Sequence, residues 1–245
     1  AGEGVGTLLN DDFPPTISLS ASASQLENAA SPNLFVVNLS NPTDQIVTVN
    51  YDTSDGTATI ADNDYIRAAG TLTFAPTETS KTISVSAIGD TKYEGNETFS
   101  VNLRNASNAT IPTGTISVLG TIIDDDPAPT ISLTATAANQ PEGQNGTTPY
   151  VFTATLSSLS GQAITVDYAT TDGTATLADK DYLQAAGKLT FAPTETSKTF
   201  TVFANGDAKY EANETFTVSL SNATANGTPI LTPNGSVIAT IANDD

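Results

Sequence analysis

The sequence predicts an all-β protein built of two tandem seven-stranded, immunoglobulin-like antiparallel sandwiches. Three observations lead to this prediction. The chain repeats a unit of about 115 residues, which is the size of a whole domain and far longer than a solenoid repeat. Each unit consists of short alternating runs separated by turn-forming residues. No segment keeps a helical period.

The repeat is visible in phrases that return almost unchanged. They are DGTAT at 55–59 and 172–176, LTFAPTETSKT at 72–82 and 189–199, and KYEGNETF at 92–99 against KYEANETF at 209–216. Prolines and acids break any continuing strand in DDDPAPT, so we place the boundary at Pro127. The first repeat is then residues 13–126 and the second is residues 127–245.

Each repeat ends with the same kind of phrase. TIIDDD at 121–126 closes the first and TIANDD at 240–245 closes the second. The chain begins with TLLNDD at 7–12, which matches both. We therefore expect residues 1–12 to be the tail of a preceding repeat in a longer parent protein.

The strands of the first repeat are predicted from its apolar or alternating runs, which are 16–20, 34–40, 46–52, 71–75, 81–88, 98–103 and 115–123. Turns every 8 to 12 residues between such runs are typical of an immunoglobulin-like sandwich. The residues expected to face the core are Ile17, Leu19, Phe35, Val37, Val47, Val49, Tyr51, Leu72, Phe74, Ile83, Val85, Phe99, Val101 and Leu103. Asp55–Gly56 and Asp172–Gly173 are interpreted as tight turns with glycine at positive φ.

Composition excludes several classes of function. The chain has no histidine and no cysteine, so it lacks the parts of zinc sites, disulfides and the common nucleophile–base pairs. Its formal net charge of −19 repels nucleic acid and anionic membrane surfaces, and no apolar run is long enough to insert into a membrane. A glycoside hydrolase with paired carboxylates would need aromatic platforms, yet the chain has no tryptophan, so we expect no enzyme.

Acidic residues gather between the predicted strands. In an antiparallel sandwich alternate connections emerge at the same end, so the connections after strands one, three and five and the exit from strand seven share one pole. The carboxylates that meet there in the first repeat are Glu27, Asp64, Asp90, Glu94, Glu97, Asp124, Asp125 and Asp126. The second repeat keeps Glu142, Asp181, Asp207, Glu211, Glu214, Asp244 and Asp245, with Asn243 in the place of Asp124.

Such crowding favours a bound cation. Two like charges about 5 Å apart repel by roughly 3 kcal/mol at an effective dielectric constant near 20. Many hard oxygen ligands without nitrogen or sulfur favour calcium over zinc and magnesium. The alternative for any single acid is a solvated loop residue, and Asp44 and Asp62 are interpreted in that way. For Glu94 and Glu97 to share an ion, the segment between them must turn, because residues three apart on a strand face opposite sides.

The phrases YDTSDGTATIADNDY, GTLTFAPTETSKTISV, GDTKYEGNETFSVNL and TIIDDD resemble the Calx-beta domain of sodium–calcium exchangers. The resemblance implies the same seven-stranded fold and a calcium site on the acids named above. It also implies that the backbone carbonyl of Lys92 is a ligand, and Lys209 occupies the matching place in the second repeat. The chain departs from the exchanger pattern at Gly89 and Gly206, where consecutive aspartates are expected before strand six.

The expected function is therefore a calcium-binding tandem module. We expect it to be a structural or adhesive segment of a larger extracellular or cell-surface protein, with calcium ions and neighbouring repeats as its partners. A regulatory calcium sensor, as in exchangers, is the alternative, and a carbohydrate-binding spacer is a third. Calcium affinity separates the first two, because a sensor binds near micromolar levels and an extracellular module nearer 0.1–1 mM.

Overall fold

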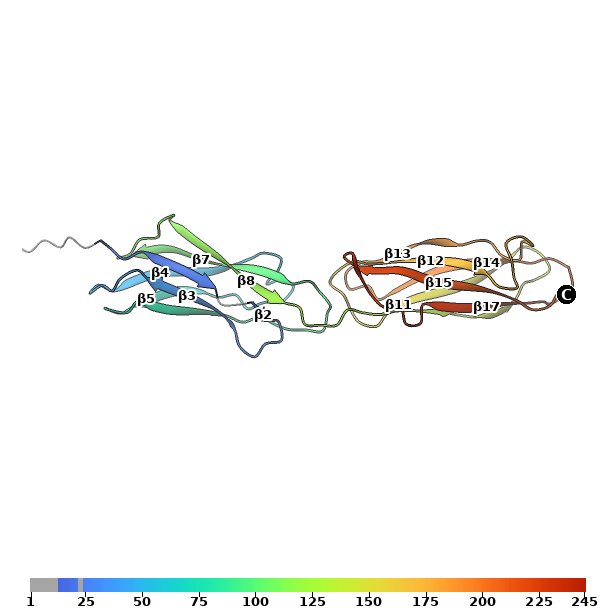
Figure 1. The fold of residues 1–245 in the computed structure, drawn as a ribbon, viewed down its shortest axis with the longest axis horizontal. Coiled ribbons are helices and arrows are strands. Elements are labelled where there is room, and N and C mark those ends of the chain that lie inside the picture. Colours follow the sequence, from blue (N-terminus) through green and yellow to red (C-terminus); the bar gives the residue numbers. More distant parts are fainter. Residues whose placement is uncertain (1–12, 22–23) are drawn as a thin grey trace, which may run out of the picture. The chain divides into compact units, whose positions relative to one another are not determined.

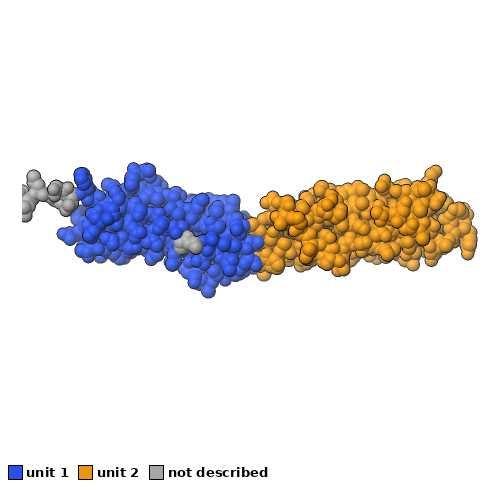
Figure 2. Space-filling view, viewed as in Figure 1, with its two compact units in different colours: residues 1–90, 96–125 blue, residues 91–95, 126–245 orange. Residues whose placement is uncertain are grey.

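A computed structural model describes residues 13–21 and 24–245, so the expected tail at 1–12 lies outside the described residues. The described chain divides into two compact units. The first unit comprises the described residues up to Asp90 together with Asn96–Asp125, and the second comprises Thr91–Gly95 and Asp126–Asp245 (Figure 2). Lys92, Glu94 and Asp126 are therefore described with the second unit. No helix among the described residues is long and apolar enough to cross a membrane.

The first unit is a sandwich of two sheets (Figure 1). The three-stranded sheet has the order β1 (Ile17–Ala21), β3 (Asn33–Leu39) and β6 (Ser80–Val85). The five-stranded sheet has the order β2 (Gln25–Leu26), β8 (Thr115–Ile123), β7 (Glu97–Ser107), β4 (Val47–Asp55) and β5 (Ala69–Phe74).

The second unit repeats this arrangement. Its smaller sheet has the order β9 (Ile131–Ala135), β11 (Thr147–Leu156) and β14 (Ser197–Asn205). Its larger sheet has the order β10 (Asn139–Pro141), β17 (Ser236–Ala242), β15 (Glu214–Ala225), β12 (Ile164–Asp172) and β13 (Ala186–Phe191), and β16 (Thr228–Pro229) pairs with β15. The prediction of an all-β protein with two tandem sandwiches is confirmed.

Three very short strands among the described residues were not predicted. One of them, β16, has 2 residues and pairs antiparallel with β15. β2 has 2 residues and pairs parallel to β8, and β10 has 3 residues and pairs parallel to β17. Segments of this length show no alternation, so sequence periodicity cannot reveal them. In each unit this parallel strand lies in the larger sheet, whereas the preceding strand, β1 or β9, pairs in the smaller one.

Each unit has its own core of alternating apolar residues from the facing sheets. The predicted inward residues are buried, apart from Leu19, Tyr51 and Leu72, which are partly buried and pack against the core. Tyr182 stacks on Phe216 in the second unit, with 4.8 Å between the ring centroids, as Tyr65 stacks on Phe99 in the first.

The DGTAT phrase closes one side of the core. The Tyr182 hydroxyl donates a hydrogen bond of 2.5 Å to Asp172, and burial together with this carboxylate raises the pKa of Tyr182 to about 12. Neither Gly56 nor Gly173 is at positive φ, contrary to the expectation for these turns. Instead, a Cβ on Gly173 would lie 2.4 Å from the backbone oxygen of Thr215, and one on Gly56 would lie 2.4 Å from that of Thr98. Glycine is therefore required by the close approach of two segments of the chain.

Candidate metal centre

The short parallel strands position the first pair of predicted ligands. Glu27 follows β2 directly and Glu142 follows β10. The backbone N–H of Glu27 donates to the carbonyl of Ile123 at 3.0 Å, and that of Glu142 donates to Ala242 at 3.1 Å. Both glutamates are buried, with 7% and 6% of their surface exposed. Each unit therefore carries a buried carboxylate anchored to the end of its last strand.

The aspartate that precedes the core tyrosine is held by its own loop. One carboxylate oxygen of Asp181 accepts the N–H of Thr176 at 2.7 Å, and its backbone carbonyl accepts the N–H of Asn205 at 2.9 Å. Asp64 in the first unit makes the same kind of hydrogen bond to the N–H of Thr59, at 2.6 Å. Because the backbone fixes one oxygen, the orientation of the whole carboxylate is determined by the DGTAT loop.

The paired glutamates behave as their spacing predicts. Glu214 is the first residue of β15, and the residues from Gly206 to Asn213 form no strand. Oxygens of Asp181, Glu211 and Glu214 all lie within 4.8 Å of one another. The segment thus turns so that two glutamates three residues apart face one point.

In the first unit, the corresponding acids lie close in pairs. Oxygens of Asp64 and Glu97 lie within 4.8 Å of each other, as do oxygens of Glu27 and Asp90. Asp125 accepts a hydrogen bond of 2.9 Å from the side chain of Asn28, and the N–H of Asp124 donates to the side-chain oxygen of Asn96 at 3.3 Å. The terminal run of the first unit is therefore tied to both the early glutamate turn and the segment before β7.

Electrostatic coupling extends the second-unit site to all its predicted acids. Burial raises the pKa of Glu142, and the nearby charges of Asp207, Glu211, Asp245 and Asp244 raise it further. Burial also raises the pKa of Glu214, to about 7, with contributions from a side-chain hydrogen bond with Asp181 and from neighbouring carboxylates. We call the set that meets here the second-unit acidic cluster: Glu142, Asp181, Asp207, Glu211, Glu214, Asp244 and Asp245.

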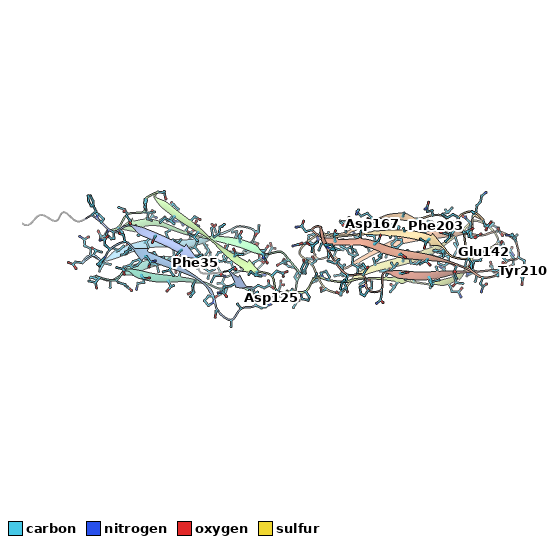
Figure 3. All side chains as sticks on the ribbon, in the orientation of Figure 1. Phe35, Asp125, Glu142, Asp167, Phe203 and Tyr210 are labelled. Carbon is cyan, nitrogen blue, oxygen red and sulfur yellow. The ribbon has the colours of Figure 1, made fainter. Side chains whose placement is uncertain are left out.

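Glu142 is labelled in Figure 3 at the end of the second unit where the C-terminus lies. The terminal run joins the cluster there, because Asp244 accepts the N–H of Gly143 at 3.0 Å. Asn243 is placed differently from the acids. Its side-chain oxygen accepts the N–H of Glu211 at 3.2 Å, so this amide orients the Glu211 segment.

The two lysines of the candidate sites each pair their ammonium group with a glutamate. The ammonium of Lys209 forms an ion pair with Glu211, and the pKa of Lys209 is raised, chiefly by this hydrogen bond and by the charge of Glu211. Lys92 forms the matching ion pair with Glu94, with 2.6 Å between the charged atoms. A metal ion bound by either glutamate would therefore compete with a tethered cation.

Sequence reasoning assigned Asp62 to the surface and passed over the equivalent Asp179. Both are exposed, and each accepts a hydrogen bond from the threonine hydroxyl of its loop. The charge of Asp179 nevertheless helps to raise the pKa of Glu214. The signal in the sequence was its place in the phrase DKDY, two residues before the half-buried Asp181.

The glycines that replace an expected ligand have a steric reason. A Cβ on Gly206 would lie 1.9 Å from the backbone oxygen of Gly143, and a Cβ on Gly89 would lie 1.9 Å from the side-chain oxygen of Asn28. In both units the turn that carries the early glutamate packs directly against this glycine. An aspartate in place of Gly206 would displace the backbone of the turn, whereas one in place of Gly89 would first displace the side chain of Asn28.

The donor set of the second-unit acidic cluster suits a hard cation. All its side-chain donors are carboxylate oxygens, and histidine and cysteine are absent from the chain. Carboxylates that are buried against one another raise each other's pKa, and a divalent ion relieves the same repulsion without protonation. The arrangement can therefore exchange protons for a cation.

Comparison with known proteins identifies both units. The family model of the Calx-beta domain matches residues 11–126 and 124–245. Sodium/calcium exchanger 1 of Bos taurus is 33% identical over 208 residues, and sodium/calcium exchanger 2 of Homo sapiens is 32% identical over 210 residues. These matches cover 78% and 80% of this chain but only 21% and 22% of the exchangers.

Among solved structures, one titled crystal structure of CBD12 from CALX1.2 is 21% identical, with a TM-score of 0.41. The match covers 91% of this chain and 98% of that one.

Replacing Gly206 by alanine should destabilise the second unit by about 1–3 kcal/mol, because the added Cβ meets a backbone atom that cannot rotate away. Chemical denaturation with calcium chelated measures the loss. Unchanged stability would mean that the early glutamate turn is free to move. Substitution by aspartate should be at least as destabilising as substitution by alanine, and it should not tighten calcium binding.

The raised pKa of Glu214 has a consequence for stability against pH. The folded state holds a proton that the unfolded state has already lost between the usual glutamate pKa of about 4.3 and about 7. With calcium chelated, the second unit should therefore lose stability as pH rises from about 5 to about 8. Glu214→Gln should flatten this profile, and melting temperatures across the range measure it. A wild-type profile that rises with pH over this range would contradict the assignment.

Proposed function

Because the chain belongs to the Calx-beta domain family, we propose that both units bind calcium through the carboxylates at one end of each sandwich. The observation that carries the proposal is the second-unit acidic cluster, where three carboxylates place oxygens within 4.8 Å and two glutamates have raised pKa values. Crowded oxygen donors of this kind are the ligands that calcium prefers.

The proposed ligands follow the geometry of each unit. In the second unit they are the seven carboxylates of the acidic cluster, with the carbonyl of Lys209. For the first repeat we propose the corresponding set, which is Glu27, Asp64, Asp90, the carbonyl of Lys92, Glu94, Glu97 and Asp124–Asp126. In the second unit, Asn243 supports the ligand set through its hydrogen bond to the Glu211 backbone, and that site has one carboxylate fewer than the first.

Calcium bound in this way would join separate segments of one unit. The second-unit acidic cluster draws on the turn after β10, the loop after β12, the segment before β15 and the end of β17. An ion that contacts all four would hold the loops of that end together and add to the stability of the fold. We propose that this stiffening serves a structural or adhesive segment of a larger extracellular or cell-surface protein.

A regulatory sensor is the second candidate function. It is favoured by the identity of about one third to sodium/calcium exchangers over most of the chain. The two roles need different affinities, because a sensor must respond to a small rise in calcium and a stiffening ion must only stay bound where calcium is abundant.

Paired substitution of Glu211 and Glu214 by glutamine tests calcium binding. With free calcium at 10 to 100 times the dissociation constant, binding stabilises a folded unit by about 1.4–2.7 kcal/mol. The double variant should lose most of this in calcium, yet be as stable as the parent or more stable in chelator, because repelling charges are removed. Chemical denaturation under both conditions measures the effect, and calorimetric titration should show heat for the parent.

The matched control is the pair Glu78→Gln and Glu195→Gln. These glutamates occupy equivalent turns in the two repeats and form half-exposed ion pairs with Lys81 and Lys198. Their replacement should change stability by the same small amount with and without calcium. If the Glu211 and Glu214 variant instead loses equal stability in both conditions, these glutamates are structural and the proposed site is wrong.

Calorimetric titration of the whole chain should give dissociation constants of about 0.1–1 mM if calcium acts as a stiffening ion. Values near 1 μM would instead support the sensor. The first unit should bind at least as tightly as the second, because it has Asp124 where the second has Asn243. Titration of the double variant assigns the heats, since only the first-unit binding should survive.

A further inference from the structure

Residues Thr91–Gly95 are seated on a turn of the second unit, to which they belong by their contacts. The N–H of Tyr93 donates to the carbonyl of Leu159 at 3.2 Å, and the N–H of Gly161 donates to the carbonyl of Tyr93 at 2.9 Å. The hydroxyl of Ser160, which is 2% exposed, donates to the same carbonyl at 3.2 Å. This is a short parallel bridge between a peptide segment and a turn.

The side chain of Tyr93 adds an apolar contact to these backbone hydrogen bonds. It is partly buried and packs against the apolar core of the second unit. Backbone hydrogen bonds fix the direction of the segment and the aromatic ring supplies apolar contact, which is the usual division of labour when a strand-like peptide binds a folded domain. The phrase KYE at 92–94 thus acts as a docking peptide for the turn at 157–162.

The second unit carries the same phrase in the same place of its fold. Lys209, Tyr210 and Glu211 repeat the order Lys, Tyr, Glu between the fifth long strand, β14, and the next, β15. The ring of Tyr210 is 83% exposed, however (Figure 3). A tyrosine that is packed in one copy of the phrase and exposed in the other offers apolar area with nothing over it.

We propose that residues 208–212 are a docking segment for a further Calx-beta unit, which would seat Tyr210 on its own turn equivalent to 157–162. The inference goes beyond calcium binding and does not rest on it. The occupant is identified by the interaction already present in this chain, because the second unit holds a segment of the same residue types by the contacts just described.

The turn that receives the segment lies directly against its glutamate. A Cβ on Gly161 would lie 2.3 Å from a carboxylate oxygen of Glu94, so a side chain at this position has to displace the end of the docking glutamate, and an acidic one also repels it. The equivalent turn of the first unit reads SNPTDQ at 40–45 against SSLSGQ at 157–162, and it has Asp44 where the second has Gly161. Asp44 would meet Glu211 with both bulk and like charge. The partner is therefore a unit like the second one, and the first unit of another copy is disfavoured.

A chain lengthened by one unit tests the proposal. A second copy of residues 127–245 is joined directly after Asp245, so that NDD followed by PAPT reproduces the natural DDDPAPT junction. Hydrogen exchange of the amides in 208–212 is then compared between the original and the lengthened chain. The Tyr210 amide should exchange at least about tenfold more slowly in the lengthened chain, as expected for a newly hydrogen-bonded amide, and the Tyr93 amide is the internal reference.

Two controls separate docking from other effects. In the lengthened chain, the glycine of the added copy that corresponds to Gly161 is replaced by aspartate, the residue that the first unit has there, and this variant should restore fast exchange at Tyr210. Slow exchange of core amides in the added copy shows that it is folded. Tyr210→Ala in the lengthened chain should also free the neighbouring amides of 208–212.

Equal exchange at Tyr210 in the two chains, with the added copy folded, overturns the proposal. Protection of the Tyr210 amide that survives the glycine-to-aspartate substitution overturns it as well. Protection that appears in the original chain as its concentration is raised would mean that another copy of this chain occupies the segment, which is contrary to the role assigned to Asp44.

Discussion

Mutual repulsion of carboxylates within a few ångströms is the constraint around which one end of the second unit is organised. Glu142 and Glu214 are the most affected, because burial removes water that would otherwise screen their neighbours. Such a site has a low free energy only when a proton or a cation is shared among the acids. The fold keeps the acids together despite this repulsion. Each acid lies on a segment next to a strand, and the packing of the strands fixes where that segment runs.

Those backbone attachments explain why loops at this end are so specific. Glu142 depends on a parallel strand of 3 residues, and Asp181 depends on the N–H of Thr176. Gly206 lets the turn after Glu142 approach the segment that leads to Glu211. Each of these backbone contacts positions one part of the site. All of them are needed together, because a cation is bound by several oxygens at once. Lys209, which forms an ion pair with Glu211, adds a positive charge that offsets part of the repulsion among the carboxylates.

Sequence reasoning reached the sandwich and the grouping of the second-unit acids because both follow from periodicity and strand direction. The spacing of two glutamates three apart indicated that the segment between them must turn, and Glu214 is in fact the first residue of β15. Sequence reasoning missed β2 and β10, which are too short to alternate, and it misjudged Gly173, whose need for glycine arises from Thr215 far along the chain. The need for glycine at such a position depends on how closely another segment of the chain passes in the folded structure. A single sequence does not reveal that distance.

A repeated sequence phrase does not guarantee that the equivalent residues have the same environment. Tyr93 and Tyr210 stand in nearly identical phrases, yet the first packs against a core and the second is exposed. What differs is the neighbour: the turn at 157–162 receives Tyr93, whereas no turn among the described residues receives Tyr210. The docking phrase contains Glu211, which is also a member of the acidic cluster. A unit that binds the segment around Tyr210 would therefore contact a residue whose charge is shared with the cluster. Docking and ion binding would then involve the same few residues.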